Sequence, residues 1–183
     1  LDISDGNITI STSYEGMEAN DITVSGGTIS LTASDDGLNA AGGNDGSSLD
    51  GRWGQNSFDS SSDTGITISG GNLVVQADGD GLDSNGSLLV SGGTVYVSAS
   101  INGGNSALDY ASSGTITGGT VITAGISGME QNFDSNSTQG CIHYNVSSPQ
   151  SAGTEIKLTD SNGNILASYM PKIDFQCIMI SSP

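Results

Sequence analysis

The chain has 183 residues and carries 20 acidic side chains against three basic ones, for a formal net charge of −17. This charge excludes nucleic acid and anionic membrane surfaces as partners, because both require clusters of Lys and Arg. No apolar run approaches the ~20 residues of a membrane-spanning helix, which excludes membrane insertion by a helix. Cations are the natural partners of so acidic a surface.

The composition also favours an exported protein. Lysine is scarce, and glycine alone supplies 28 residues beside many Asn, Ser and Asp. The chain opens with Leu rather than Met, which indicates a mature or trimmed piece. Short islands of Ile, Val and Leu recur along the chain and argue against disorder. We therefore expect an ordered protein that is secreted or displayed on a cell surface.

Two short elements recur from the N-terminus onward. A Gly-Gly element begins with Ser or Thr at 25–28, 69–72, 91–94 and 117–120. The other element places an apolar residue among acidic or small ones, and that apolar residue is Met17, Leu38, Leu82, Leu108 and Met129. The unit is about 21 residues long, with an insertion over 42–64 and a smaller one before Leu108. A fixed period of this length predicts a solenoid.

Each unit contains three short pieces in which apolar and polar residues alternate, which is the period of a β-strand. The sequence predicts an all-β protein whose residues 1–134 form a right-handed parallel β-helix of about five rungs. Its core would consist of stacked columns. The predicted columns are Met17/Leu38/Leu82/Leu108/Met129, Val24/Ile68/Val90/Ile116 and Ile29/Leu73/Val95/Val121.

The period stops after Asn132, and we expect residues 135–183 to form an antiparallel β cap. Two alternating segments, 154–158 and 165–169, flank a turn sequence over 160–163, which is typical of a hairpin. A further strand is predicted over 173–180. Cys141 and Cys177 both lie in this part, where they either form one disulfide or serve as two small apolar residues.

Stacking the units also stacks their carboxylates in two predicted columns, Glu15/Asp36/Asp80/Ser106/Ser127 and Glu18/Asn39/Asp83/Asp109/Glu130. Like charges about 5 Å apart repel by roughly 3 kcal/mol at an effective dielectric constant near 20. Only Arg52 among the basic residues precedes the cap, whereas Ca²⁺ accepts 6–8 oxygen ligands from carboxylates, amides and carbonyls. We therefore predict Ca²⁺ between rungs, although each single Asp is also a common turn residue. The candidate ligands are Glu15, Glu18, Asp21, Asp35, Asp36, Asn39, Asp78, Asp80, Asp83, Asp109 and Glu130.

Three long blocks carry a family resemblance: YEGMEANDITVSGGTISLTASDDGLNAAGGNDGS over 14–47, DGDGLDSNGSLLVSGGTVYV over 78–97, and ALDY over 107–110. With the SAGTEIKLTDSNGN segment, they resemble pectate-lyase-like β-helix proteins of clostridial and other Gram-positive surfaces, described as carbohydrate-binding domains. The resemblance implies a right-handed parallel β-helix, several Ca²⁺ ions, and binding of cellulose and polygalacturonate. It places Glu15, Glu18, Asp35, Asp36, Asp80, Asp83 and Asp109 in the matching acidic motifs. The two cysteines are not features of that family, and the chain ends earlier than family chains do.

Together these observations predict a calcium-binding, extracellular polysaccharide-binding module for polygalacturonate or cellulose. Bound Ca²⁺ would bridge uronate carboxylates to the acidic columns. Aromatic side chains stack on sugars, and the candidates are Trp53, Phe58, Tyr96 and Tyr110. Trp53 could equally fix its own loop to the barrel.

Two alternatives remain at this point. A calcium-dependent pectate lyase would need a base near the acidic columns, and Arg52 is a weak candidate for it. Lys157 and Lys172 belong to the cap, and a lone His143 in an alternating strand is more often packed or exposed than catalytic. The third reading is a surface filament subunit, because a short solenoid with a strand at each end could associate head-to-tail.

Overall fold

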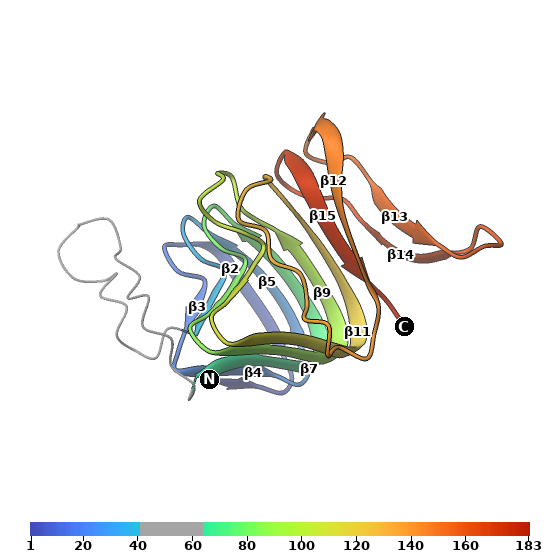
Figure 1. Cartoon of the computed structure of the whole chain (residues 1–183). Coiled ribbons are helices and arrows are strands. Elements are labelled where there is room, and N and C mark those ends of the chain that lie inside the picture. Colours follow the sequence, from blue (N-terminus) through green and yellow to red (C-terminus); the bar gives the residue numbers. More distant parts are fainter. Residues whose placement is uncertain (41–63) are drawn as a thin grey trace.

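The computed structural model describes residues 1–40 and 64–183. Within these residues the chain is all-β and contains both parallel and antiparallel strand pairs (Figure 1). The described residues contain no helix long and apolar enough to cross a membrane. The insertion predicted over 42–64 lies outside the described residues except for Thr64.

Strands of successive sequence units lie side by side in two sheets. The order in the larger sheet is β1-β4-β7-β9-β11-β15-β12, with β2 and β5 continuing beside β7, and the order in the second sheet is β10-β8-β6-β3. The strands are β1 (Asp2–Ile3), β2 (Asn7–Ser13), β3 (Met17–Glu18), β4 (Asp21–Val24), β5 (Thr28–Ala33), β6 (Leu38–Ala40), β7 (Gly65–Ala77), β8 (Leu82–Ser84), β9 (Ser87–Ser98), β10 (Leu108–Tyr110), β11 (Ser113–Gly125), β12 (Cys141–Gln150), β13 (Ile156–Thr159), β14 (Ile165–Tyr169) and β15 (Phe175–Ser181).

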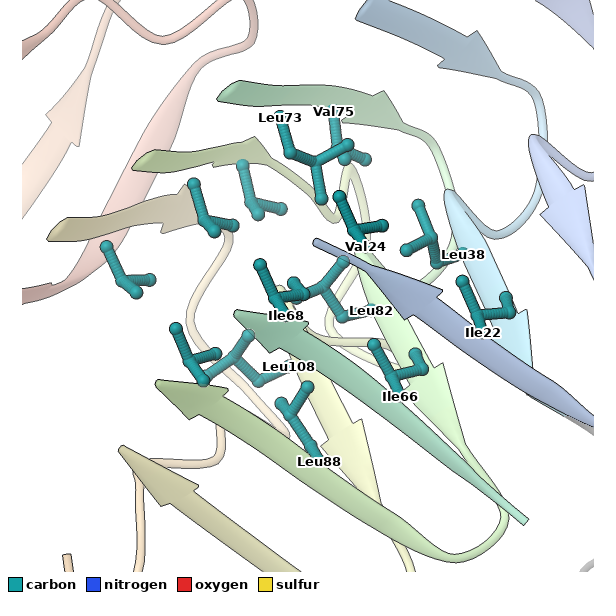
Figure 2. Packing of buried hydrophobic residues seen from close by; sticks show 14 of the residues in the cluster. Ile22, Val24, Leu38, Ile66, Ile68, Leu73, Val75, Leu82, Leu88 and Leu108 are labelled. Carbon is teal, nitrogen blue, oxygen red and sulfur yellow. The ribbon is translucent and has the colours of Figure 1, made fainter. Parts of the chain in front are cut away.

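The predicted core columns are confirmed by the register of the parallel pairs, apart from Met129. Leu82 pairs with Leu38 on one side and Leu108 on the other. Ile68 pairs with Val24 and Val90, and Leu73 pairs with Ile29 and Val95. All of these side chains are buried in one apolar cluster, and Figure 2 shows Leu38, Leu82, Ile68 and Leu73 among those that pack together inside the strands. The alternation of the sequence produces this result because successive strand residues face opposite sides of a sheet.

Three of the four Gly-Gly elements bend a single strand, whereas the element at 25–28 separates β4 from β5, as the three-piece unit predicts. In β7, β9 and β11 one strand runs through both pieces of the unit, and the parallel register shifts at the glycines. Gly71 has φ +81°, and a Cβ there would lie 2.8 Å from the backbone of Gly26 in the preceding unit. Only glycine combines this backbone angle with so close an approach.

The fifth unit departs from the repeat, so the prediction for Met129 is wrong. Met129 is 59% exposed and belongs to no strand. Phe133 joins the core cluster instead. Hydrogen bonds from Gly128 N and Ser127 Oγ to the Glu130 carboxylate turn this segment away from the β10 direction. No further unit follows it to hold a strand in register.

The C-terminal residues are antiparallel, as predicted. β15 pairs with β11 on one side and β12 on the other, and β13 and β14 form a two-stranded hairpin. A second apolar cluster joins this hairpin to the outer side of the larger sheet. Its buried members are Ile122, Ala124, Ile156, Ala167, Tyr169, Phe175 and Ile180.

Candidate acidic site

One acidic column runs along the end of the second sheet. The amide of Asp80 donates to Asp36 Oδ1 over 2.7 Å, and the amide of Ser106 donates in turn to Asp80 Oδ1 over 2.5 Å. The backbone carbonyl of Asp80 accepts the amide hydrogen of Gly37. Two successive units thus present a carboxylate to the backbone of the next unit, as expected for the Asp36/Asp80/Ser106 part of the first predicted column.

The second predicted column is also formed, by direct strand pairing. Asn39 pairs with Glu18 and Asp83, and Asp83 pairs with Asp109. Asn39 is fully buried, and neither its Oδ1 nor its Nδ2 has a hydrogen-bond partner within the described residues. A buried amide without partners costs free energy. A cation that accepts the amide oxygen would remove part of this cost.

The carboxylates of this site, Asp36, Asp80 and Asp83, are at most 7% exposed. Burial, reinforced by repulsion from Asp36, raises the pKa of Asp80 and that of Asp83 to about 8. Burial also raises the pKa of Asp109. The two lysines do not belong to the parallel strands, since Lys157 lies in β13 and forms an ion pair with Glu155 at 2.8 Å, and Lys172 precedes β15. In the absence of a cation, the site therefore favours protonated carboxyl groups at neutral pH.

An open groove of about 450 Å³ lies against this site. Its acidic residues are Asp35 and Asp78, and its floor includes Gly79, where a Cβ would lie 2.7 Å from Asp35 Oδ1 and 2.5 Å from Asp36 Oδ1. The carboxylates of Asp35 and Asp36 thus approach the same backbone position. The groove therefore adjoins the buried column directly.

Sequence reasoning missed the aromatic residue of this groove. Tyr14 is 49% exposed and lines it, and a hydrogen bond to Asp35 raises the pKa of Tyr14 to about 12. Ile101, Asn102 and Asn105 form another wall. These residues belong to the small insertion before Leu108. That insertion was the feature of the sequence that could have indicated an extra loop here. Ser100 Oγ holds this loop by donating to the carbonyls of Asn102 and Asn105.

Two predicted metal ligands lie elsewhere. Asp21 is exposed at the start of β4, where its backbone carbonyl accepts the N-terminal amino group of Leu1. Glu130 lies out of register, and Gln131 takes the column position next to Asp109, to which its Nε2 donates over 3.1 Å. The prediction that Glu130 extends the column is therefore wrong.

The predicted sugar-binding aromatics are mostly engaged in other contacts. The Tyr96 ring stacks on Tyr169 with centroids 4.8 Å apart, so one ring face packs against the hairpin. Tyr110 Oη donates to the carbonyl of Asn132, and its ring covers Gly114. Trp53 and Phe58 lie outside the described residues, as does the catalytic candidate Arg52.

Cys141 and Cys177 are both free, so the disulfide alternative is wrong. The register of β12 and β15 places Cys141 opposite Ser181 and Cys177 opposite Asn145, which separates the two cysteines along the strands.

The protein should therefore carry two thiols per chain. Alkylation with iodoacetamide in denaturant, without any reductant, should add two adducts to the intact mass. Prior reduction should leave that count unchanged. A mass without adducts, restored to two only by reduction, would show a disulfide and contradict the register.

No family model, no curated protein and no solved structure matches the chain.

Proposed function

We propose that this protein is a calcium-binding, extracellular polysaccharide-binding module. The observation that carries the proposal is the buried site of Asp80, Asp83 and Asn39, which lies beside an open acidic groove. A secreted or Gram-positive cell-surface location follows from the sequence resemblance and suits such a ligand.

We further infer that the parallel strands form a right-handed β-helix. Successive units pair in parallel register in both sheets, which supports a coil that advances by one unit per turn. Right-handed crossovers are nearly universal between parallel strands. Such a coil explains why the middle units each contribute one short strand, such as β8, and one long strand, such as β9.

Calcium fits the donor set of the site. Asp80 and Asp83 supply carboxylates, and Asn39 supplies an unpartnered amide oxygen. Ca²⁺ binds such oxygen atoms in flexible geometry, which suits ligands from different units. The ion would also replace the protons that the raised pKa values of Asp80 and Asp83 otherwise retain.

The groove supports binding of an acidic polysaccharide. A chain of net charge −17 repels a polyuronate unless a cation lies between the two. Calcium at Asp35 and Asp78 would bridge their carboxylates to those of the sugar, while the exposed Tyr14 ring offers a stacking surface. Polygalacturonate could use both the calcium bridge and the stacking surface. Cellulose, which has no carboxylates, could use only the stacking surface.

Binding is a better fit than cleavage. A lyase requires a base beside the bound sugar. Within the described residues no Lys or Arg lines the groove, whose residues are acidic, neutral or apolar. The proposal is therefore recognition, with the lyase as the alternative, whose candidate base Arg52 lies outside the described residues.

The test is calorimetric titration of the protein with polygalacturonate oligomers in CaCl₂ and in EDTA. We expect binding only with Ca²⁺, and Tyr14→Ala should weaken it about tenfold if stacking contributes about 1–1.5 kcal/mol. Tyr14→Phe should retain most of the affinity, because the ring remains. Tyr144→Ala removes another exposed tyrosine, from β12, and is the matched control.

Equal affinity in EDTA would overturn the role of calcium. Full affinity of Tyr14→Ala would overturn the assignment of the groove. Continuous growth of ultraviolet absorbance from an unsaturated product would replace the binding proposal by the lyase alternative.

A further inference from the structure

A second cluster of potential ligands lies where the C-terminal strands meet the last parallel strand. It consists of Glu130, His143 and Cys177, whose ligand atoms all lie within 4.8 Å of one another. His143 Nε2 is 3.0 Å from Cys177 Sγ. The cluster shares no residue with the groove described above.

The fold brings these three residues together from three separate segments. β15 lies between β11 and β12, and Cys177 faces Gly125 on one side and Asn145 on the other. His143 is two residues from Asn145 on β12 and therefore lies on the same face of the sheet as Cys177. Glu130 lies in the segment that follows β11. This is the same placement that leaves it out of register with the acidic column.

Hydrogen bonds hold the Glu130 carboxylate in place. Asn145 Nδ2 donates to Oε1 over 3.0 Å, the amide of Gly128 donates to Oε2 over 2.5 Å, and Ser127 Oγ donates to Oε1. Partial burial opposes ionisation, but these hydrogen bonds outweigh it and lower the pKa of Glu130 to about 2. A fixed carboxylate of this kind is typical of a metal ligand oriented by a second layer of residues.

The three side chains line a small cavity of about 10 Å³, which is close to the space of a single water molecule. Its other walls include Ala99, Thr123 and Met179. Thr123 and Met179 belong to paired strands, so the cavity is bounded by rigid backbone. A single ion with one small additional ligand fits such a space, whereas an organic substrate does not.

We propose that Glu130, His143 and Cys177 bind one Zn²⁺ ion, with a fourth position open to water. Nitrogen, sulfur and oxygen donors together are typical of zinc and other borderline transition metals, whereas Ca²⁺ takes oxygen donors only. The thiol proton leaves to solvent as the Zn–S bond forms, so binding releases one proton.

The required geometric adjustment is small. Tetrahedral coordination with Zn–N near 2.0 Å and Zn–S near 2.3 Å places nitrogen and sulfur about 3.6 Å apart. The observed separation is 3.0 Å, and the exposed His143 side chain can retract by that difference.

A thiol nucleophile is a poorer reading of the same cluster. Cys177 is only 6% exposed, and burial together with the Glu130 charge raises the pKa of its thiol to about 12. A nucleophilic cysteine requires a lowered pKa and access to substrate. A carboxylate disfavours ionisation of a neighbouring thiol, but both groups can bind a cation that lies between them.

Zinc at this position would join three segments that are otherwise held by strand pairing and packing. It would connect β12 and β15 to the segment that ends the parallel strands. The site would therefore fasten the C-terminal strands to the rest of the protein, independently of calcium in the acidic column.

The experiment uses the full chain, reduced, with calcium in excess so that the acidic site is saturated. Co²⁺ is added as a spectroscopic probe, and Zn²⁺ affinity is measured by competition with a chromogenic chelator. We expect one metal ion per chain, an ultraviolet thiolate-to-cobalt band, and the visible bands of tetrahedral Co²⁺. Displacement of Co²⁺ by one equivalent of Zn²⁺ should abolish both signals.

Variants make the assignment specific. Loss of a residue that only orients a ligand lowers metal affinity by at most about 100-fold. His143→Gln and Cys177→Ser each remove a ligand, so each should weaken Zn²⁺ binding by more than that. Asn145→Ala removes such an orienting residue and should cost about tenfold. Cys141→Ser, at the free cysteine that is not in the cluster, is the matched control and should bind normally.

His143 is exposed, so His143→Gln keeps the test valid even if the buried Cys177→Ser variant fails to fold. Absence of the thiolate band, or unchanged Zn²⁺ affinity in His143→Gln, would overturn the zinc site. Either result would leave the calcium and polysaccharide measurements untouched.

Discussion

Without divalent cations, the free energy of unfolding should be lower at pH 8.5 than at pH 5 by about 4 kcal/mol for each of two buried carboxyl groups, and so by about 8 kcal/mol in all. The pKa values of Asp80 and Asp83 are about 8 in the folded protein, against about 3.9 for an Asp in an unfolded chain. Between these values the folded state holds more protons than the unfolded state. Raising the pH through this window therefore removes stability.

The measurement is thermal unfolding by circular dichroism in EDTA at pH 5, 6.5 and 8.5. A loss of about 8 kcal/mol corresponds to a decrease in Tm of roughly 16–32 °C for a chain of this length. The lowered pKa of Glu130 affects stability mainly below pH 5, and the raised pKa of Cys177 affects it mainly above pH 8.5. Neither group therefore changes the direction of the expected pH dependence. Addition of CaCl₂ at pH 8.5 should restore part of the lost stability, because binding of one ion to the folded state adds about 2.7 kcal/mol at a concentration 100 times Kd.

Two variants test the origin of this pH dependence. Asp83→Asn should reduce it, because one of the two titrating groups is removed while the shape of the side chain is kept. Asp2→Asn, an exposed acid in β1, should leave it unchanged. A Tm in EDTA that is equal or higher at pH 8.5 would show that the buried carboxyl groups do not control stability.

Leu82→Ala should destabilise the protein by about 3–4 kcal/mol, within the range of 2–5 kcal/mol for buried leucines. Leu82 is fully buried at the centre of its column, between Leu38 and Leu108 (Figure 2). Its truncation leaves a cavity that neighbouring strands cannot close, because hydrogen bonds on both sides fix the strand spacing. Urea unfolding at pH 7 in calcium measures the effect.

Leu166→Ala is the matched control, because Leu166 lies in β14 and is 49% exposed. It should cost less than about 0.5 kcal/mol, as is usual for surface positions. If the two variants lose equal stability, the column does not dominate the core. If Leu82→Ala loses less than the control, the column is not the core at all.

The core columns could be predicted because their cause is local. Two-residue alternation fixes which side chains share a face, and the recurrence of the unit fixes which ones stack. The same argument placed Asp36 beside Asp80 and Asn39 beside Asp83, and both placements are observed. The hairpin around 160–163 was equally readable, because its turn residues and alternating flanks lie within one short segment.

The ends of the repeat could not be predicted in the same way. The sequence of the fifth unit matches the pattern, yet Gln131 instead of Glu130 lies beside Asp109. A unit in the middle is held in register by hydrogen bonds on both sides, whereas the last unit has them on one side only. Local contacts, such as those from Ser127 and Gly128 to Glu130, then decide its path.

The sequence by itself determined the all-β class, the parallel register of the repeated strands and the stacking of their acidic residues, because all three follow from a short period. Only the tertiary structure decided that Tyr14 and the loop before Leu108 share one groove, that Tyr96 packs against the hairpin, and that the cysteines stay apart. It also decided the meeting of Glu130, His143 and Cys177. Packing between segments that are distant in sequence brings these residues together. The periodicity of the sequence does not specify which face of the C-terminal strands packs against the last repeated strand.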